Sequence, residues 1–205
     1  MASLETGWPE SRPPIIRRVS NALVLGALRG FWGVDVVGLE LVPRTGAMIV
    51  AGNHVSNLDG FLLAVGLSGV RWPCFLGKAE LFRVPVLGWF LRKCGSIPLE
   101  RGRGDVAALR TAEDLLRRGW SLGMFPEGTR NKTGGRVSPK LGVAFLAART
   151  GALVVPARII GAARWPAPGR LEIRFGLPMA FVGQASDKGQ VRAFAQAVMD
   201  RIFTL

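Results

Sequence analysis

The 205-residue sequence is poor in the residue types that build metal centres and disulfide frameworks. It contains one histidine, two cysteines and no tyrosine. A single histidine with no cluster of carboxylates beside it offers too few ligands for a zinc site. Cys74 and Cys94 lie in a chain without secretory features, so reduced thiols are expected rather than a disulfide. These absences argue against a metal-dependent or disulfide-stapled protein.

Long hydrophobic runs and an early secretion signal are also missing. The longest apolar run, residues 61–70, ends at Arg71, well short of the roughly 18 apolar residues of a spanning helix. The first charge of the chain is Glu5, and prolines interrupt any early apolar segment. Hydrophobic residues nevertheless make up 49% of the chain. We therefore expect a peripheral or monotopic protein at the cytoplasmic face of the cell membrane.

Acidic residues are scarce, since 14 Asp and Glu stand against 27 Lys and Arg and the net charge is +13. Such an excess calls for an anionic partner, which is nucleic acid, lipid headgroups or a phosphorylated substrate. A nucleic-acid role predicts aromatic side chains interleaved with arginines on one face, and the sequence has no such pattern. Membrane lipid and phosphate are therefore the expected partners, and nucleic acid is not.

The single histidine stands where acid–base chemistry can occur. His54 follows a run of apolar residues typical of a buried strand, and Asp59 comes five positions later. Five residues along a regular helix lie about 140° apart, which prevents a side-chain contact. The two can meet only if His54 stays in a loop and Asp59 opens the next helix, with Ser56 or Asn57 as its N-cap.

A second motif, FPEGTR at Phe125 to Arg130, follows another apolar run. Read together with NHxxxxD at Asn53 to Asp59, it resembles the glycerolipid acyltransferase family, whose best-known members are bacterial 1-acylglycerol-3-phosphate acyltransferases. The resemblance extends from about residue 42 to 160. It includes the segment from Lys78 to Leu81 and the segment from Gly95 to Arg101, and also a strand at 154–159 with a central proline. Pro98 departs from the family pattern and raises the question of how regular its strand is.

The resemblance implies acyl transfer from a thioester to an alcohol. His54 would act as the general base, Asp59 would orient it, and the substrate alcohol would be the nucleophile, so no acyl-enzyme is needed. The donor would be acyl-CoA or acyl carrier protein as co-substrate, with no further cofactor and no metal. Asn53 and Lys78 are candidates for lining the site.

The same resemblance implies a phosphate-binding region. Arg101 and Arg130 would bind a phosphate monoester, together with the backbone of Gly128 and Thr129. Glu127 cannot contact phosphate favourably, so it would bind a substrate hydroxyl or orient Arg130.

The alternation of apolar strands and helices predicts an α/β fold with a single domain, a largely parallel central sheet flanked by helices, and an N-terminal amphipathic helical segment. We expect residues 1–32 to form a tail and a membrane-associating helix, and residues 33–205 to form the acyltransferase domain. Strands are expected at 33–41, 47–51, 72–76, 96–99, 120–125, 153–160 and 171–175, and helices at 14–32, 58–67, 79–93 (interrupted by Pro85), 105–118, 141–150 and 190–203.

Two segments have alternative interpretations. The helix at 14–32 carries Val19 and Leu23 on an apolar stripe, which suits either a membrane interface or packing on the core. The apolar stretches 61–70 and 81–91 could line an acyl-chain channel or form core helices.

The leading hypothesis is fatty acyl transfer to the free hydroxyl of a lysophospholipid, foremost 1-acylglycerol 3-phosphate, which gives phosphatidic acid. The alternatives are another lysolipid acceptor such as lyso-ornithine lipid, a thioester hydrolase, and a non-catalytic basic module that binds membrane or nucleic acid.

Overall fold

The computed structural model describes residues 33–85, 88–89, 91, 96–99, 104–131, 135–164, 167 and 169–205, together with Val19, Leu23, Gly26 and Gly30. Within this part of the chain, strands and helices alternate as the sequence predicts, except that the helix predicted at 79–93 begins as a 3-10 helix over residues 79–83. The strands are β1 (Val34–Val37), β2 (Met48–Gly52), β3 (Cys74–Lys78), β4 (Ile97–Leu99), β5 (Ser121–Met124), β6 (Leu153–Ile160) and β7 (Leu171–Phe175). The helices are α2 (Asp59–Gly66), α4 (Gly104–Arg117), α5 (Gly142–Thr150) and α6 (Lys188–Thr204), with short 3-10 helices η1 (Leu39–Leu41), η2 (Ala79–Arg83) and η3 (Ala162–Arg164).

The strands form one sheet in the order β1-β7-β6-β2-β5-β3-β4. Every neighbouring pair is parallel except β6 and β7, so the predicted largely parallel sheet is confirmed. All five residues of β2 are buried, as expected of a strand covered on both faces. Because β2, β5 and β6 run parallel, their carboxyl ends meet at the same edge of the sheet, where α/β folds place their sites.

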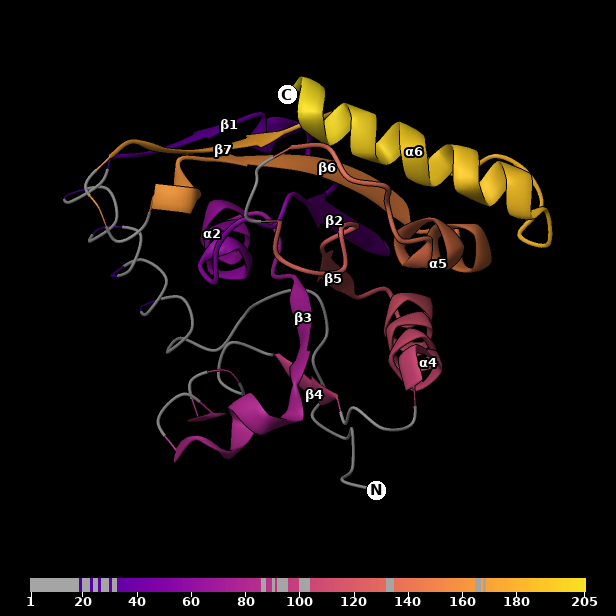
Figure 1. The fold of residues 1–205 in the computed structure, drawn as a ribbon, viewed down its shortest axis with the longest axis horizontal. Helices are drawn as coiled ribbons and strands as arrows, with labels where there is room; N and C mark the ends of the chain where they lie inside the picture. Colours follow the sequence, from indigo (N-terminus) through magenta and orange to yellow (C-terminus); the bar gives the residue numbers. More distant parts are fainter. Residues whose placement is uncertain are drawn as a thin grey trace.

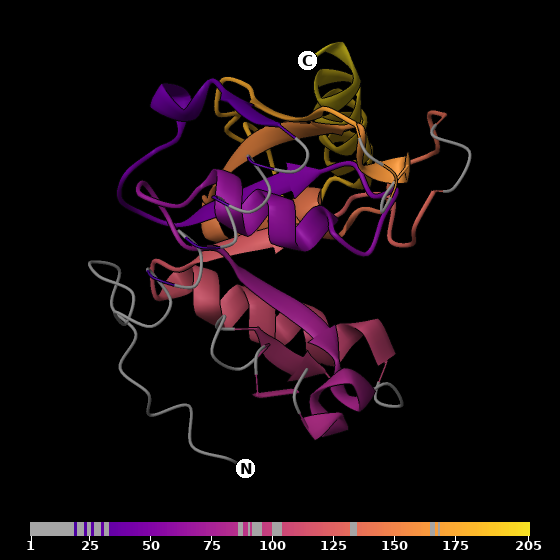
Figure 2. The same ribbon diagram turned by 90° about the vertical axis from the view of Figure 1, so that its left-hand side faces the viewer.

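The helices cover both faces of the sheet (Figures 1 and 2). On one face, α2 contributes Leu62 and Leu63 to a buried apolar cluster with side chains of β2, β6 and β7. On the other face, α4, α5 and α6 pack around a second cluster. Residues 61–66 are therefore part of a core helix. Leu81, Val84 and Trp89, from the second apolar stretch, are exposed.

The strand predicted at 33–41 is shorter than expected, because β1 ends at Val37 and η1 follows. The change of direction occurs at Gly38, whose φ is +77°. A Cβ at this position would lie 2.2 Å from the carbonyl oxygen of Phe175, so only glycine allows the chain to turn so close to β7. Pro98 lies in β4 at the edge of the sheet, the place where a strand tolerates proline.

Glycines end two of the predicted helices. After α4 the N–H of Gly119 donates to the carbonyl of Leu116 and the N–H of Trp120 to that of Leu115, which is the Schellman arrangement. Gly119 has φ +82°, and Gly151, which ends α5, has φ +71°. Both positions are those that the sequence predicts.

The helix predicted at 14–32 lies almost entirely outside the described residues. The four residues of this segment that the structure describes are helical, and the side chains of Val19 and Leu23 are 51% and 69% exposed. In the described part of the chain, no helix combines the length and apolar character needed to cross a membrane.

Candidate active site

The loop after β2 brings the single histidine against a buried carboxylate. His54 lies in the loop, and Asp59 is the first residue of α2. The Nδ1 atom of His54 is 2.8 Å from Oδ2 of Asp59, so the geometry required by the five-residue spacing is present. With Asp59 ionised, this contact assigns the proton to Nδ1 and leaves Nε2 free to accept another. The His54 side chain keeps 22% of its surface exposed, while that of Asp59 has none.

The Asp59 carboxylate also shapes the loop that carries His54. Its Oδ2 atom accepts hydrogen bonds from the backbone N–H groups of Val55 at 2.6 Å and Ser56 at 2.7 Å. The prediction that Ser56 or Asn57 caps α2 is wrong: Leu58 occupies the N-cap and makes no side-chain capping bond. Asp59 instead reaches back from the first turn, so the carboxylate that orients the histidine also stabilises the start of the helix.

The loop after β5 covers the other side of the histidine. Phe125 begins a turn in which the N–H of Gly128 donates to its carbonyl, with Pro126 in the second position. The Phe125 ring stacks on the imidazole of His54 with centroids 4.1 Å apart and planes 14° from parallel. Gly128 has φ +74°, and a Cβ there would approach the Lys140 side chain to 2.9 Å. Proline is favoured in the second position of such a turn, and the positive φ requires the glycine, so the turn sets the aromatic ring against the histidine.

Two further contacts join this loop to the backbone of His54. Oε1 of Glu127 accepts a hydrogen bond from the N–H of His54 at 3.0 Å, and the N–H of Asn131 donates to the carbonyl of His54 at 2.7 Å. Burial raises the pKa of Glu127, and the bond from His54 offsets part of the rise. Glu127 therefore holds the histidine loop in place, a contact that the sequence did not reveal.

Asn53 also has a defined partner. Its side-chain nitrogen donates to the carbonyl of Ile159 at 2.9 Å, and its side-chain oxygen accepts from the N–H of Ile159 at 2.7 Å. The amide side chain thereby extends the pairing of β2 with β6 by one residue. Asn53 was a candidate for lining the site, and the structure turns its amide toward β6.

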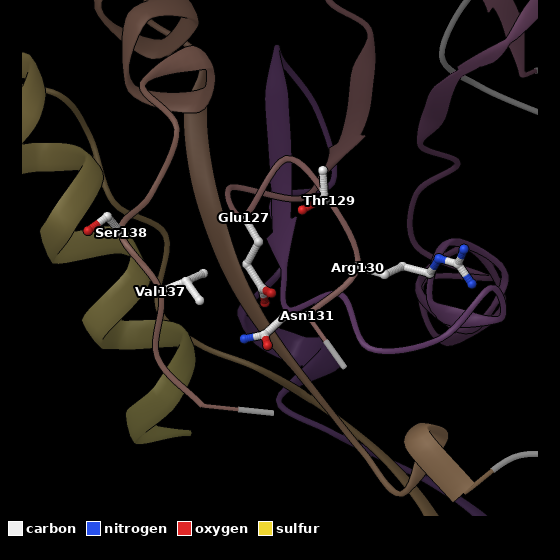
Figure 3. A pocket seen from close by; sticks show the side chains of 6 residues that line it. All are labelled: Glu127, Thr129, Arg130, Asn131, Val137 and Ser138. Atoms are coloured by element: carbon white, nitrogen blue, oxygen red, sulfur yellow. The ribbon is translucent and has the colours of Figure 1, made fainter. Parts of the chain in front are cut away.

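A pocket of about 400 Å³ adjoins this loop and is lined by Glu127, Thr129, Arg130, Asn131, Val137 and Ser138. The carboxylate of Glu127 ends beside the side chain of Asn131, whereas the side chain of Arg130 extends away from Val137 and Ser138 (Figure 3). Gly128, Thr129 and Arg130 are all exposed. Arg130 can therefore meet a charged ligand at the mouth of the pocket.

The positions of two expected site side chains are not described. Arg101 lies outside the described residues, and of Lys78 only the backbone is described, at the end of β3. In the described part of the chain no three His, Cys, Asp or Glu residues gather as a metal site would require.

The sequence did not reveal Phe125 or Asn131 as a partner of His54. Phe125 stands directly after an apolar strand and reads as its last core residue. Asn131 begins a basic, glycine-rich loop, 131–136, whose backbone amides the sequence suggests as phosphate donors and not as partners of the His54 backbone. No local signal identifies either contact, because each depends on the pairing of β2 with β5.

Sequence comparison links the chain to acyltransferases, which include a lyso-ornithine lipid O-acyltransferase of Pseudomonas aeruginosa, 42% identical over 90 residues that cover 42% of this chain and 32% of that protein. The family model described as Acyltransferase matches residues 33–160. The chain is 38% identical over 135 residues to the 1-acyl-sn-glycerol-3-phosphate acyltransferase LPAT1, chloroplastic, of Arabidopsis thaliana, a match covering 64% of this chain and 37% of that protein. It is 30% identical over 189 residues to the 1-acyl-sn-glycerol-3-phosphate acyltransferase of Bacillus subtilis, covering 89% of this chain and 92% of that protein.

A solved structure shares the fold. The crystal structure of the 1-acyl-sn-glycerophosphate (LPA) acyltransferase PlsC from Thermotoga maritima matches with a TM-score of 0.70 and 29% identity, over 90% of this chain and 80% of that chain. The chain thus spans little more than a third of the plant relative and nearly all of the Bacillus one.

Proposed function

Because the chain belongs to the acyltransferase family, we propose that it transfers a fatty acyl group from a thioester donor to the free hydroxyl of 1-acylglycerol 3-phosphate, giving phosphatidic acid. The observation that carries this proposal is the 2.8 Å contact between His54 Nδ1 and Asp59 Oδ2. Glu127 and Asn131 connect this pair to a pocket that also contains Arg130. The names of the Arabidopsis, Bacillus and Thermotoga proteins support the same activity.

The proposed reaction needs one proton carrier. Nε2 of His54 takes the proton of the acceptor hydroxyl as the oxygen attacks the thioester carbonyl. The tetrahedral intermediate then collapses, the C–S bond breaks, and the thiolate leaves and receives the proton from His54. Asp59 stabilises the imidazolium between these steps, and the contact with Nδ1 keeps the ring in one tautomer. The products are phosphatidic acid and the free thiol of the donor.

Arg130 is the proposed contact of the acceptor phosphate, with the backbone of Gly128 and Thr129 beside it. A guanidinium offers a fork of donors that matches phosphate oxygens. Arg101 belongs to the same proposal by its place in the family motif. The donor is acyl-CoA or acyl carrier protein, both of which present the acyl group as a thioester.

We further propose that the enzyme works at the membrane surface from the cytoplasmic side. Val19 and Leu23 expose half or more of their apolar side chains, which favours an interfacial helix over packing on the core. Leu81, Val84 and Trp89 add apolar groups that are 41%, 49% and 56% exposed. The net charge of +13 suits anionic headgroups.

The test is transfer by the purified protein from labelled acyl-CoA, or from acyl carrier protein, to a panel of lysolipids, with products identified by mass. Phosphatidic acid should form from 1-acylglycerol 3-phosphate and should not form with the His54→Ala variant. Product with lyso-ornithine lipid alone would contradict the proposed acceptor. Release of free fatty acid independent of any acceptor would identify a thioester hydrolase instead.

A further inference from the structure

A cationic side chain with no predicted role lies close to the pocket, in the strand segment 154–159 that belongs to the family resemblance. Arg158 belongs to β6 and directly precedes Ile159, the residue that both side-chain atoms of Asn53 bind. Asn53 in turn precedes His54. Neighbouring residues of β6 alternate between the faces of the sheet, and Ala157 and Ile159 belong to the cluster beneath α2. Arg158 therefore projects toward the opposite face, where α6 lies.

Contacts with α6 agree with this direction. The guanidinium of Arg158 lies 4.5 Å from the ring centroid of Phe203, a residue of α6, and that of Arg136 lies 5.8 Å from the same centroid. Arg174 stands directly opposite Arg158 in the pairing of β6 with β7. Three arginines thus gather around the end of α6.

Arg158 differs from the other two in its partners. Arg136 pairs with Asp200 at 3.4 Å, and Arg174 pairs with Glu172 at 2.7 Å. Arg158 makes no ion pair with any carboxylate in the described part of the chain. Burial, followed by the positive charges of Arg136 and Arg174, lowers the pKa of Arg158, although a guanidinium remains charged at neutral pH. A partly buried cation between two other cations is unfavourable unless an anion joins them.

The pocket lies next to this cluster. Val137 and Ser138, which line the pocket, follow Arg136 in the chain, and Figure 3 shows them beside α6. Glu127, on the other wall, is close enough to raise the pKa of Arg158 against the stronger effects of burial and the two arginines. Arg130 extends away from Val137 and Ser138. On the α6 side of the pocket, the positive charge therefore comes from Arg136 and Arg158 and not from Arg130.

We infer that Arg158, with Arg136 beside it, forms a second anion subsite on the α6 side of the pocket and binds the phosphomonoester of the acceptor opposite Arg130. This inference rests on the proposed function, because it assigns that phosphate a contact. A phosphomonoester carries a charge of about −1.5 to −2 at neutral pH and three acceptor oxygens, so it can engage two guanidiniums at once. Acceptors whose headgroup lacks a phosphomonoester would gain less from Arg158, which makes this residue a determinant of acceptor choice.

The experiment compares Arg158→Met, which keeps the aliphatic stem, and Arg158→Lys, which keeps the charge, with wild type. The matched control is Arg170→Met, which removes one charge from an exposed arginine paired with Asp35. Loss of charge-assisted contacts typically weakens binding by about tenfold to a hundredfold. Arg158→Met should raise the KM for 1-acylglycerol 3-phosphate by this factor while the KM for the donor stays near wild type. The acceptor KM of Arg158→Lys should lie between those of wild type and Arg158→Met. The acceptor KM of the Arg170→Met control should equal that of wild type.

Calorimetric titration with glycerol 3-phosphate measures the affinity of the subsite for a phosphomonoester when no acyl transfer takes place. Affinity should fall in Arg158→Met by a similar factor and stay unchanged in the control. If wild type is active while Arg158→Met keeps its acceptor KM and its affinity, the inference is wrong. An equal rise in both KM values together with a lower urea midpoint would assign Arg158 to packing against Phe203 and would also overturn it. If wild type does not acylate 1-acylglycerol 3-phosphate, the proposed function fails, and the titration still decides the subsite.

Discussion

At the scale of single residues, two buried carboxylates hold His54 from different sides. Asp59 fixes the ring through Nδ1, and Glu127 fixes the backbone through the N–H group. Each has one buried oxygen, Oδ1 of Asp59 and Oε2 of Glu127, with no hydrogen-bond partner in the described part of the chain. The two carboxylates therefore fix both the ring and the backbone of His54.

Replacing either member of the His54–Asp59 pair should abolish most of the activity. His54→Ala removes the base, and the loss expected is at least about 10²- to 10⁴-fold in kcat. Asp59→Asn should also be severely impaired, because an amide cannot stabilise the imidazolium. Initial rates with folded variants provide the measurement. A His54→Ala protein that retained more than about a tenth of wild-type activity would overturn the mechanism, and a fully active Asp59→Asn would reduce Asp59 to a helix-start residue.

Glu127→Gln should change how stability depends on pH. The folded-state pKa of Glu127 is raised, so the folded protein binds this proton more tightly than the unfolded chain, whose glutamate pKa is about 4.3. The cost of the ionised side chain is thus fully present above the folded-state pKa and disappears as pH falls to the unfolded value. Glutamine can still accept from the His54 N–H. Urea unfolding at several pH values measures the free energy of unfolding of both proteins. The excess of the variant over wild type should be largest at neutral pH. A stability difference between variant and wild type that grows toward acid pH would contradict this expectation.

At the scale of elements, the site depends on how closely the ends of β2 and β5 approach α2. A row of rings connects the core to the histidine, with Phe75 and Phe125 centroids 6.3 Å apart and Phe125 stacked on His54. Gly123 of β5 makes room for this row, since a Cβ there would lie 2.1 Å from a ring atom of Phe75. Small residues on a strand can thus position an aromatic ring in the loop that follows.

Gly123→Ala should destabilise the protein and lower activity together. The added methyl group must displace Phe75, and overpacking of this kind typically costs about 1 to 3 kcal/mol. Gly60→Ala is the matched control, because its Cβ would meet the same ring at 3.6 Å, an ordinary contact. Urea unfolding and initial rates of both variants provide the comparison. Equal effects of the two substitutions would show that the space beside Phe75 is not limiting.

At the scale of the whole molecule, positive charge and exposed apolar groups both suit a lipid surface. Residues 1–32 contain Arg17, Arg18 and Arg29 beside apolar residues, and each interfacial basic side chain contributes on the order of 1 kcal/mol to binding anionic lipid. The catalytic part of the chain is basic as well, so the charge alone does not identify the segment that binds.

Deleting residues 1–32 should weaken flotation of the protein with anionic liposomes. The intact protein should also bind neutral liposomes less tightly and lose affinity as salt rises, because ions screen the interaction. Flotation across lipid compositions and salt concentrations measures both effects. Unchanged binding by the shortened protein would assign the membrane contact to the basic surface of residues 33–205.

The sequence by itself determined the two motifs and most of the elements, although the strand at 33–41 ends at Val37 and residues 79–83 of the helix predicted at 79–93 form η2. Apolar runs and helical periodicity are local, and so are the glycines that end α4 and α5, which is why their positions could be predicted closely. The contact of His54 with Asp59 could also be predicted. With five positions between them, the two side chains meet only if His54 lies in the loop and Asp59 begins the helix.

Tertiary structure alone decided which distant residues meet. Glu127 reaches the backbone of His54, and Asn53 binds Ile159, because β2 lies between β5 and β6 in the sheet. The antiparallel direction of β7 and the projection of Arg158 toward α6 have the same origin. Strand order and the choice of face follow from burying both surfaces of the sheet at once, and that requirement involves the whole chain rather than any short segment of it.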